Sequence, residues 1–197
     1  MPVAEKIDLY KLHKPEYVTP KQPAFVDVKT ARYLAVEGQG KPGSELFQAQ
    51  VGALYGAAYT IKMTGKSAGR GDFKVCALEG LYSDIDHEKH TMKWKLLIRV
   101  PDFVTERDLL EAVTALMKKG KGGEAGNVRI ETLKEGTCVQ ALHVGPYDEE
   151  AATMARMEAF AKENGRVLGS PHHEIYLSDP RRVPPERLRT ILRFPLV

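Results

Sequence analysis

An internal repeat is the sequence feature that most constrains how this chain of 197 residues can fold. Three stretches recur in the same order, and the matches are residues 33–40 with 138–145, 78–82 with 173–177, and 99–101 with 193–195. The offset between the copies falls once, from 105 to 95 and then 94 residues, because the first half has the longer helix and loop. Two tandem copies of one β-α-β-β unit are the simplest account of this spacing.

The first half shows the elements of that unit. Ser44 is a candidate N-cap for a helix with one apolar face, and Gly65 marks its expected end. A polar hairpin loop is expected at residues 83–91. The strands predicted from β-branched and aromatic residues are 25–28, 32–36, 74–82 and 92–100.

The second half repeats this order after a linking helix. That helix begins after Thr105, since Asp108 three residues later resembles a capping box, and the Lys/Gly segment 120–126 follows as a linker. Asp148 is expected to cap the helix of the second repeat, which ends at Asn164-Gly165. The strands predicted here are 128–133, 137–144, 172–177 and 188–194.

We therefore divide the chain into a Pro-rich N-terminal arm and one domain with an internal repeat. The parts are the arm 1–24 and the domain 25–197, with repeat one at 25–101, the linking helix at 105–119 and repeat two at 127–197. Four prolines (Pro2, Pro15, Pro20 and Pro23) are expected to interrupt any helix in the arm. Tyr10, Leu12 and Tyr17 are candidates for pinning it to the body.

Composition narrows the class of protein. Hydrophobic residues make up 43%, enough for a core, and the formal net charge of +3 is too small to indicate nucleic-acid or membrane binding. Cys76 and Cys138 form neither a disulfide framework nor a zinc motif, and both are expected to be small buried strand residues. Because the chain has no signal-peptide pattern and no apolar run of about 20 residues, we expect a cytoplasmic protein, as a monomer or weak dimer.

The repeat predicts an α+β fold with antiparallel sheets, helices on one face and a ligand cleft between the pseudo-symmetric halves. Strand alternation places His172, Glu174 and Tyr176 on one face of a strand. Glu79 holds the matching position of the first repeat and is therefore the expected partner of Glu174 in the cleft. A mid-strand Glu fits a half-buried apolar surface poorly, which favours a functional role.

Several stretches resemble the signatures of stand-alone GyrI-like small-molecule-binding proteins, over roughly residues 24–197. They are His143-Val144-Gly145-Pro146-Tyr147, His172 to Pro180, Leu78-Glu79-Gly80-Leu81, Trp94 and Pro101 to Glu106. The family has the tandem, SHS2-like fold expected from the repeat. In that family a cleft between the repeats holds aromatic, often cationic, molecules, and a glutamate at the position of Glu174 is its central polar group.

The resemblance also implies candidate activities. Some single-domain members hydrolyse the strained cyclopropane of DNA-alkylating natural products, part of the family inhibits gyrase, and others are effector modules fused to DNA-binding domains. Hydrolytic members tend to carry tryptophans after the Glu-Gly-Leu stretch, where this chain has Tyr82 and Ser83. No helix-turn-helix pattern precedes residue 24, so we do not expect a direct transcription regulator.

Glu174 is the candidate general base, and the alternative is a solvent-facing strand residue. Tyr147 and Tyr176 are candidate donors to a developing phenolate, although tyrosines in such positions are equally often core residues. Trp94 is a candidate stacking wall, with ordinary core as the alternative. The other candidate ligand contacts are Tyr55, Glu79, Tyr82 and His143. Tyr55 fits a core position better than a site position. His143 is expected to hydrogen-bond a loop. We interpret His173 as structural, facing away from Glu174 and toward the helix.

Other clusters are weaker. Asp84, Asp86, His87 and His90 resemble metal ligands but fall in a predicted loop without a rigid frame, so we expect no metal. Arginines at 181, 182, 187 and 189 are interpreted as a solvated face, and the Gly-rich segment 65–71 lacks phosphate-loop spacing.

The resulting prediction is a cofactor-independent hydrolase that opens cyclopropane-bearing aromatic xenobiotics with water activated by Glu174. One alternative is a non-catalytic binder or sensor of amphipathic cationic aromatic drugs. The other is a gyrase-inhibitor-like protein partner.

Overall fold

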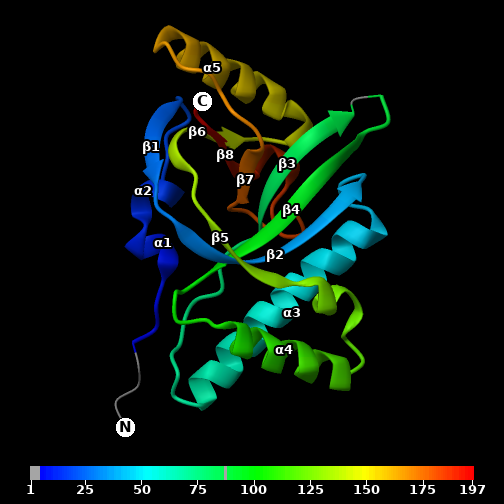
Figure 1. Ribbon diagram of the computed structural model, residues 1–197. Coiled ribbons are helices and arrows are strands. Elements are labelled where there is room, and N and C mark those ends of the chain that lie inside the picture. The colour runs from blue at the N-terminus through cyan, green and yellow to red at the C-terminus, as the bar shows by residue number, and fades with distance from the viewer. Residues whose placement is uncertain (1–4, 87) are drawn as a thin grey trace.

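The computed structural model describes residues 5–86 and 88–197, which form one eight-stranded antiparallel sheet with helices on both of its faces (Figure 1). The strand order is β1-β6-β8-β7-β3-β4-β2-β5. The strands are β1 Ala24–Val28, β2 Ala31–Gly40, β3 Glu79–Asp86, β4 Thr91–Val100, β5 Arg129–Leu133, β6 Gly136–Val144, β7 His172–Tyr176 and β8 Arg189–Pro195. The predicted α+β class is confirmed.

The strand order reads the same from either edge when the two repeats are exchanged, so the halves are pseudo-symmetric. Strand β3 pairs with β7 at the centre of the sheet and joins the two halves. The first strand of each repeat crosses over: β1 pairs with β6 of the second repeat, and β5 pairs with β2 of the first. Each repeat is therefore a β-β-α-β-β unit, one strand larger than the predicted β-α-β-β unit.

Each half buries one sheet face under its own helix. Helix α3 (Glu45–Ser67) covers β2 and β4, and α4 (Glu106–Lys118) packs against α3. Helix α5 (Glu150–Glu163) covers β6 in the other half. Figure 1 shows α5 at one end of the sheet and α3 with α4 at the other. Strands β3 and β7 therefore present the segment of this face that lies between α3 and α5.

Helix caps formed largely as predicted. The Ser44 side chain accepts a hydrogen bond from the Phe47 N–H, and Thr105 and Asp108 form a reciprocal capping box. The start of α5 was predicted wrongly, because the 3₁₀ turn η2 (Tyr147–Glu149) precedes it and makes Glu149, not Asp148, the N-cap residue. Helix α3 also continues two residues past Gly65.

The predicted strand 74–82 is wrong at both ends. Strand β3 begins at Glu79, because the N–H groups of Ala77 and Leu78 bond to the hydroxyl oxygens of Tyr10 and Tyr55 rather than to a neighbouring strand. It continues to Asp86, past a register shift against β4 that begins at Ser83. Cys76 is buried but lies before the strand, and buried Cys138 lies on β6.

The N-terminal arm covers the other face of the sheet. It contains two one-turn helices, α1 (Leu9–Leu12) and α2 (Lys14–Tyr17), so its prolines do not exclude helix; Pro15 is tolerated because it lies in the first turn of α2. Tyr10 and Tyr17 dock the arm, whereas Leu12 is 66% exposed and does not. The predicted linker 120–126 contains most of the 3₁₀ helix η1 (Gly123–Asn127), and η3 (Pro185–Arg187) precedes β8.

Within residues 5–86 and 88–197, no helix is long and apolar enough to span a membrane.

Candidate active site between helices α3 and α5

Glu174 stands in the middle of β7, directly opposite Gly80 on β3. The missing side chain at Gly80 makes room for its neighbour, because a Cβ there would lie 2.8 Å from the hydroxyl oxygen of Tyr82. Tyr82 therefore folds back toward β7, and its hydroxyl lies 2.6 Å from that of Tyr176. The Glu-Gly-Leu stretch thus brings an aromatic side chain to the carboxyl group on the next strand.

The Glu174 carboxylate is held by two donors. Tyr176 donates its hydroxyl proton to Oε2 at 2.7 Å, and the His172 Nε2 lies 2.9 Å from Oε1, which makes Nε2 the protonated ring nitrogen. Because the single proton of Tyr176 is committed to Glu174, its oxygen accepts the proton of Tyr82. His172, Tyr82 and Tyr176 therefore fix a carboxylate that is only 9% exposed.

The charge of Glu174 acts on the surrounding phenols. Burial, and then the nearby Glu174 carboxylate, raise the pKa of Tyr82 and Tyr176 far above the ordinary value. Burial also raises the pKa of Tyr147, helped by the carboxyl groups of Glu150 and Glu174. These phenols stay protonated at neutral pH and act as hydrogen-bond donors.

Tyr147 differs from the other tyrosines in having a free donor. It lies in η2 just before α5, its ring meets that of Tyr176 edge-on at 5.7 Å, and it is 39% exposed. Within the described part of the chain its hydroxyl makes no hydrogen bond. Of the two predicted phenolate donors, Tyr147 therefore has an uncommitted proton and Tyr176 does not.

Glu150, which the sequence analysis missed, is the second buried acid on this face. It is 5% exposed and belongs to the inward stripe of α5 with Thr153, Met157 and Ala161. The helical spacing of this stripe was the available signal, because these four residues recur at the interval of one helix turn. Burial, and then the charge of Glu174, raise its pKa to about 9.

Trp94 does not form a wall of this site. It is 2% exposed, its Nε1 donates to Gln50 Oε1 at 2.7 Å, and its ring packs edge-on against Phe47 at 5.2 Å. A Cβ at Gly38 would lie 2.5 Å from the Trp94 Nε1, so that side of the indole is closed as well. The core alternative is the one found, and the stacking prediction is wrong.

Tyr55 and His143 both hold backbone in place. The Tyr55 hydroxyl accepts from the Leu78 N–H at 2.9 Å, and its half-buried ring packs against the core of the first half. His143 is buried, with Nδ1 3.0 Å from Thr153 Oγ1 and Nε2 3.0 Å from the Pro146 carbonyl. The expected hydrogen bond from His143 to the loop is present, and both of its ring nitrogens are engaged.

Glu79 does not share the face of Glu174. It lies opposite Ile175, the neighbour of Glu174 along β7, and directly opposite residues share a face. Its side chain is therefore fully buried on the arm side, with Oε1 accepting from the Tyr17 hydroxyl at 3.1 Å and Oε2 3.0 Å from His173 Nε2. Glu79 and Glu174 match in the sequence repeat, but they are one position out of step in the β3–β7 register, where Glu174 pairs with Gly80. Because neighbouring positions of a strand face opposite sides of the sheet, the two glutamates lie on opposite faces.

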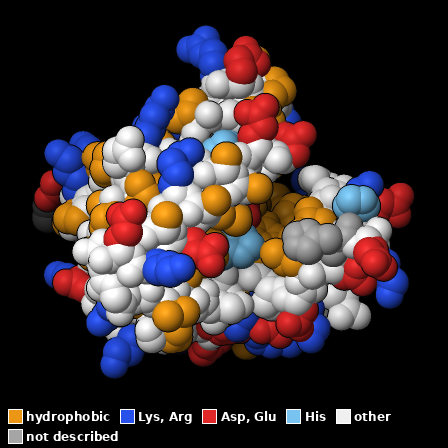
Figure 2. Space-filling model, turned by 90° about the horizontal axis from the view of Figure 1, so that it is seen from above, with side chains coloured by type: hydrophobic (Ala, Val, Ile, Leu, Met, Phe, Trp, Pro, Cys, Tyr) orange, Lys and Arg blue, Asp and Glu red, His pale blue; other side chains and the backbone are white. Residues whose placement is uncertain are grey.

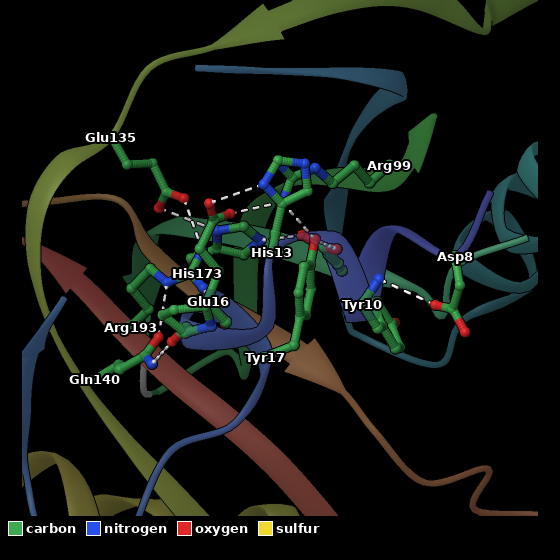
Figure 3. Close-up of polar contacts among 12 residues, drawn as sticks. Asp8, Tyr10, His13, Glu16, Tyr17, Arg99, Glu135, Gln140, His173 and Arg193 are labelled. Atoms are coloured by element: carbon green, nitrogen blue, oxygen red, sulfur yellow. Dashed lines mark hydrogen bonds and ion pairs between the residues drawn. The ribbon is translucent and has the colours of Figure 1, made fainter. Parts of the chain in front are cut away.

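A network of paired charges lies beneath the arm (Figure 3). His173 bridges Glu79 and Glu135, Arg193 donates to Glu135 at 2.9 Å, and Arg99 donates to Glu16 of the arm at 2.6 Å. His173 faces away from Glu174 as predicted, but toward this network and not toward α5.

The charges in this network set one another's protonation. Burial alone would lower the pKa of His173, but Glu135 and Glu79 outweigh it and raise the value to about 9. Burial would raise the pKa of Glu135, but His173 and Arg193 outweigh it and hold the value at about 2. His173 and Glu135 are therefore both charged at neutral pH.

Two surface hollows lie away from Glu174. One of about 560 Å³ is lined by His143, Thr153, Arg156 and neighbouring residues at the start of α5. The other, of about 370 Å³, lies beside the β3–β4 hairpin at Ile85, His90 and Met92. Figure 2 shows that the molecule seen from above is hollowed and that hydrophobic side chains line the hollow. We place the candidate site at Glu174 because the buried carboxyl groups and the free phenol are there.

The other sequence clusters show no comparable arrangement. Asp84 pairs with Lys93 at 2.8 Å, His87 lies outside the described residues, and the described residues contain no group of three potential metal ligands suited to an ion. In the arginine-rich loop, Arg181 and Arg182 pair with Asp179. Burial raises the pKa of both cysteine thiols to about 12.

Comparisons with known proteins show which solved structures share this fold. A protein described as a hydrolase from Listeria innocua is 38% identical, with a TM-score of 0.89 over 98% of this chain and 100% of that one. A second hydrolase structure from Listeria innocua is 37% identical, with a TM-score of 0.90 and the same coverage. The C-terminal domain of EcmrR, 15% identical with a TM-score of 0.62 over 89% of this chain and 97% of that one, shares the fold.

The search of curated proteins found no match. A family model, the GyrI-like small molecule binding domain, matches residues 21–197, which include all eight strands and Glu174. The chain therefore belongs to the GyrI-like family of small-molecule-binding domains.

Proposed function

We propose that this protein hydrolyses a strained cyclopropane ring in aromatic small molecules, with Glu174 as the general base. One observation carries the proposal: a buried carboxylate fixed by His172 and Tyr176 beside a half-exposed phenol, Tyr147, whose proton is free. The similarity to two hydrolase structures over almost the whole chain supports a hydrolytic reaction.

The reaction needs no redox partner. Glu174 takes a proton from water as the water oxygen attacks the ring CH₂, so a C–O bond forms while a cyclopropane C–C bond breaks. The released electron pair moves through the conjugated dienone to its carbonyl oxygen, which becomes a phenolate. The Tyr147 hydroxyl donates a hydrogen bond to that oxygen as charge develops.

The supporting residues have positioning roles. Tyr176 and His172 orient the two oxygens of Glu174, and Tyr82 orients Tyr176. A base with few accessible rotamers keeps its lone pair aimed at the water, which lowers the entropy lost on reaching the transition state. The Tyr147 ring, which is 39% exposed, is the aromatic surface that this group offers to a ligand.

Turnover of a neutral spirocyclopropyl dienone, followed as the water adduct by mass spectrometry, tests the proposal. We expect many adducts per protein molecule and a loss of about 10²–10⁴-fold in Glu174→Gln. The control Glu163→Gln removes an exposed carboxylate at the end of α5 and should keep wild-type turnover. Equal turnover in Glu174→Gln and wild type would contradict the role of Glu174.

A second function, binding of aromatic cations without catalysis, is favoured by the same buried carboxylate, since desolvation strengthens its attraction for a cation. Titration with tetraphenylphosphonium and with a neutral aromatic of similar size separates the two functions. A binder loses affinity only for the cation in Glu174→Gln and produces no water adduct from the dienone.

A further inference from the structure

The position of Glu150 is not explained by the role of Glu174 alone. Glu150 is the first residue of α5 and points inward, and its Oε1 is buried with no hydrogen-bond partner among the described residues. Thr190 Oγ1 on β8 is buried beside it, and hydrogen bonding from this hydroxyl lowers the pKa of Glu150, but the two groups do not reach full hydrogen-bond geometry among the described residues. Buried acceptors are rarely left without a well-formed hydrogen bond in folded proteins, so the protonation state of this carboxyl group needs a physical account.

Among residues 5–86 and 88–197, no cation compensates Glu150. The titratable groups that face it are Glu174 from β7, Tyr82 from β3 and Tyr147 from η2, and none of them carries positive charge. Taking a carboxylate out of water without a counter-ion is costly. The positive end of α5 offsets only part of this desolvation cost. A negative charge on Glu150 is therefore the less stable form.

Burial and the neighbouring Glu174 charge therefore favour the protonated form of Glu150. Glu174 receives hydrogen bonds from His172 and Tyr176, which is the arrangement of a carboxylate. Among the described residues, the one side chain placed to donate to Glu150 is Thr190, and it does not form a full hydrogen bond. The proton therefore resides on Glu150, in agreement with its pKa of about 9.

We infer that Glu150 is the proton donor of the reaction and that it works with Glu174 as an acid–base pair. This inference rests on the proposed function. Glu174 takes a proton from water as the C–O bond forms, and Glu150 gives its proton to the phenolate oxygen that Tyr147 stabilises. When the product has left, a proton passes from Glu174 to Glu150, so that one turnover adds one water molecule and leaves the protein unchanged.

The pH profile of kcat/KM is the first test. Wild-type activity should fall as the pH rises through about 9, where Glu150 loses its proton. Glu150→Gln should lower turnover by about 10²–10⁴-fold and remove this alkaline limb. Glu150→Asp should restore part of the turnover together with the limb. The control Glu149→Gln alters the exposed neighbour and should behave as wild type.

Infrared difference spectroscopy of the ligand-free protein is the second test. Wild type minus Glu150→Gln at pH 7 should show the C=O stretch of one protonated carboxyl group, which disappears near pH 9. Absence of this band overturns the inference, and so does unchanged turnover with an intact alkaline limb in Glu150→Gln. Failure of the proposed function gives a different result, because the band is then present while wild-type protein forms no water adduct.

Discussion

The two faces of the β3–β7 strand pair handle buried acids differently. Beneath the arm, Glu79 and Glu135 contact His173, and Arg193 completes the set. On the opposite face, Glu150 of α5 and Glu174 of β7 lie among tyrosines, and within the described part of the chain their only histidine partner is His172 at Glu174. The strand pair thus faces a charge-compensated structural network on one side and an acidic pair with a single histidine contact on the other.

This difference indicates which buried acids are suited to catalysis. Paired buried charges are costly to disturb, and they fix the arm and the sheet in one arrangement. An acid without a cation has a perturbed protonation state and an open hydrogen-bonding capacity, which are the properties a catalytic group needs. Burial alone does not separate the two faces, since Glu79 and Glu174 are both at most 9% exposed.

The largest expected difference between the two faces is between the effects of Glu174→Gln and Arg193→Met on turnover and on the free energy of unfolding. We expect Glu174→Gln to lose about 10²–10⁴-fold in turnover with little change in the free energy of unfolding. Paired turnover and urea-unfolding measurements on this variant check both halves of the statement. A Glu174→Gln protein that is strongly destabilised would show that Glu174 belongs to the structural class of buried charge.

Arg193→Met should give the opposite result. Arg193 is 1% exposed and bonds to Glu135, Gln140 and the Glu16 carbonyl, so its removal leaves buried acceptors unpaired and should lower the free energy of unfolding by about 3–5 kcal/mol. The control is Arg181→Met, which breaks an exposed pair with Asp179 and should leave the urea midpoint almost unchanged, because water and salt screen exposed ion pairs. Similar urea midpoints for both variants would show that the buried Arg193 network stabilises the protein no more than an exposed ion pair does.

Tyr147→Phe tests the free phenol. It keeps the ring that packs on Tyr176, so ligand binding should persist while turnover falls by about 10²–10³-fold, the worth of one oxyanion donor. Tyr176→Phe should instead cost about 1–3 kcal/mol of stability, because Tyr82 loses its hydrogen-bond acceptor. Turnover and unfolding of both variants, measured together, decide between the two roles; a stability loss in Tyr147→Phe equal to that in Tyr176→Phe counts against them.

The pH dependence of stability should show both faces at once. The pKa of His173 rises from 6.5 to about 9 on folding. Its contribution to the free energy of unfolding is therefore complete below pH 6.5 and is lost as the pH rises through about 9. Folding raises the pKa of Glu150 from 4.5 to about 9, so stability is also lost across that range. Each extra proton on the folded protein gives a slope of about 1.4 kcal/mol per pH unit.

Between pH 6.5 and 9 the wild type should therefore lose stability about twice as steeply as Glu150→Gln, in which only the His173 contribution remains. Urea unfolding at several pH values measures both slopes. Parallel plots of the free energy of unfolding against pH for the two proteins would mean that Glu150 is ionised in the folded state. The acidic face would then hold no carboxyl group with a raised pKa at Glu150.

Local patterns anticipated the elements better than the site. The Thr105–Asp108 capping box and the alternating apolar strands depend on neighbours in sequence, so they were predictable. Strand β3 was misplaced because the side chains of Tyr10 and Tyr55, distant in sequence, bond to the backbone just before Glu79. Trp94 was misread because a buried wall and an exposed wall have the same local sequence, and only Gln50 and Phe47 show which is present.

The sequence by itself determined the tandem repeat, the α+β class and the family resemblance, and it nominated Glu174 as a candidate site residue, because each depends on patterns within one repeat or on short motifs. Only the tertiary structure decided that Glu79 lies on the face opposite Glu174 and that Glu150 lies on the same face as Glu174. The physical reason is strand and helix periodicity. A register shift of one residue reverses the face of a strand side chain, and the inward face of a helix is known only once its partner sheet is in place.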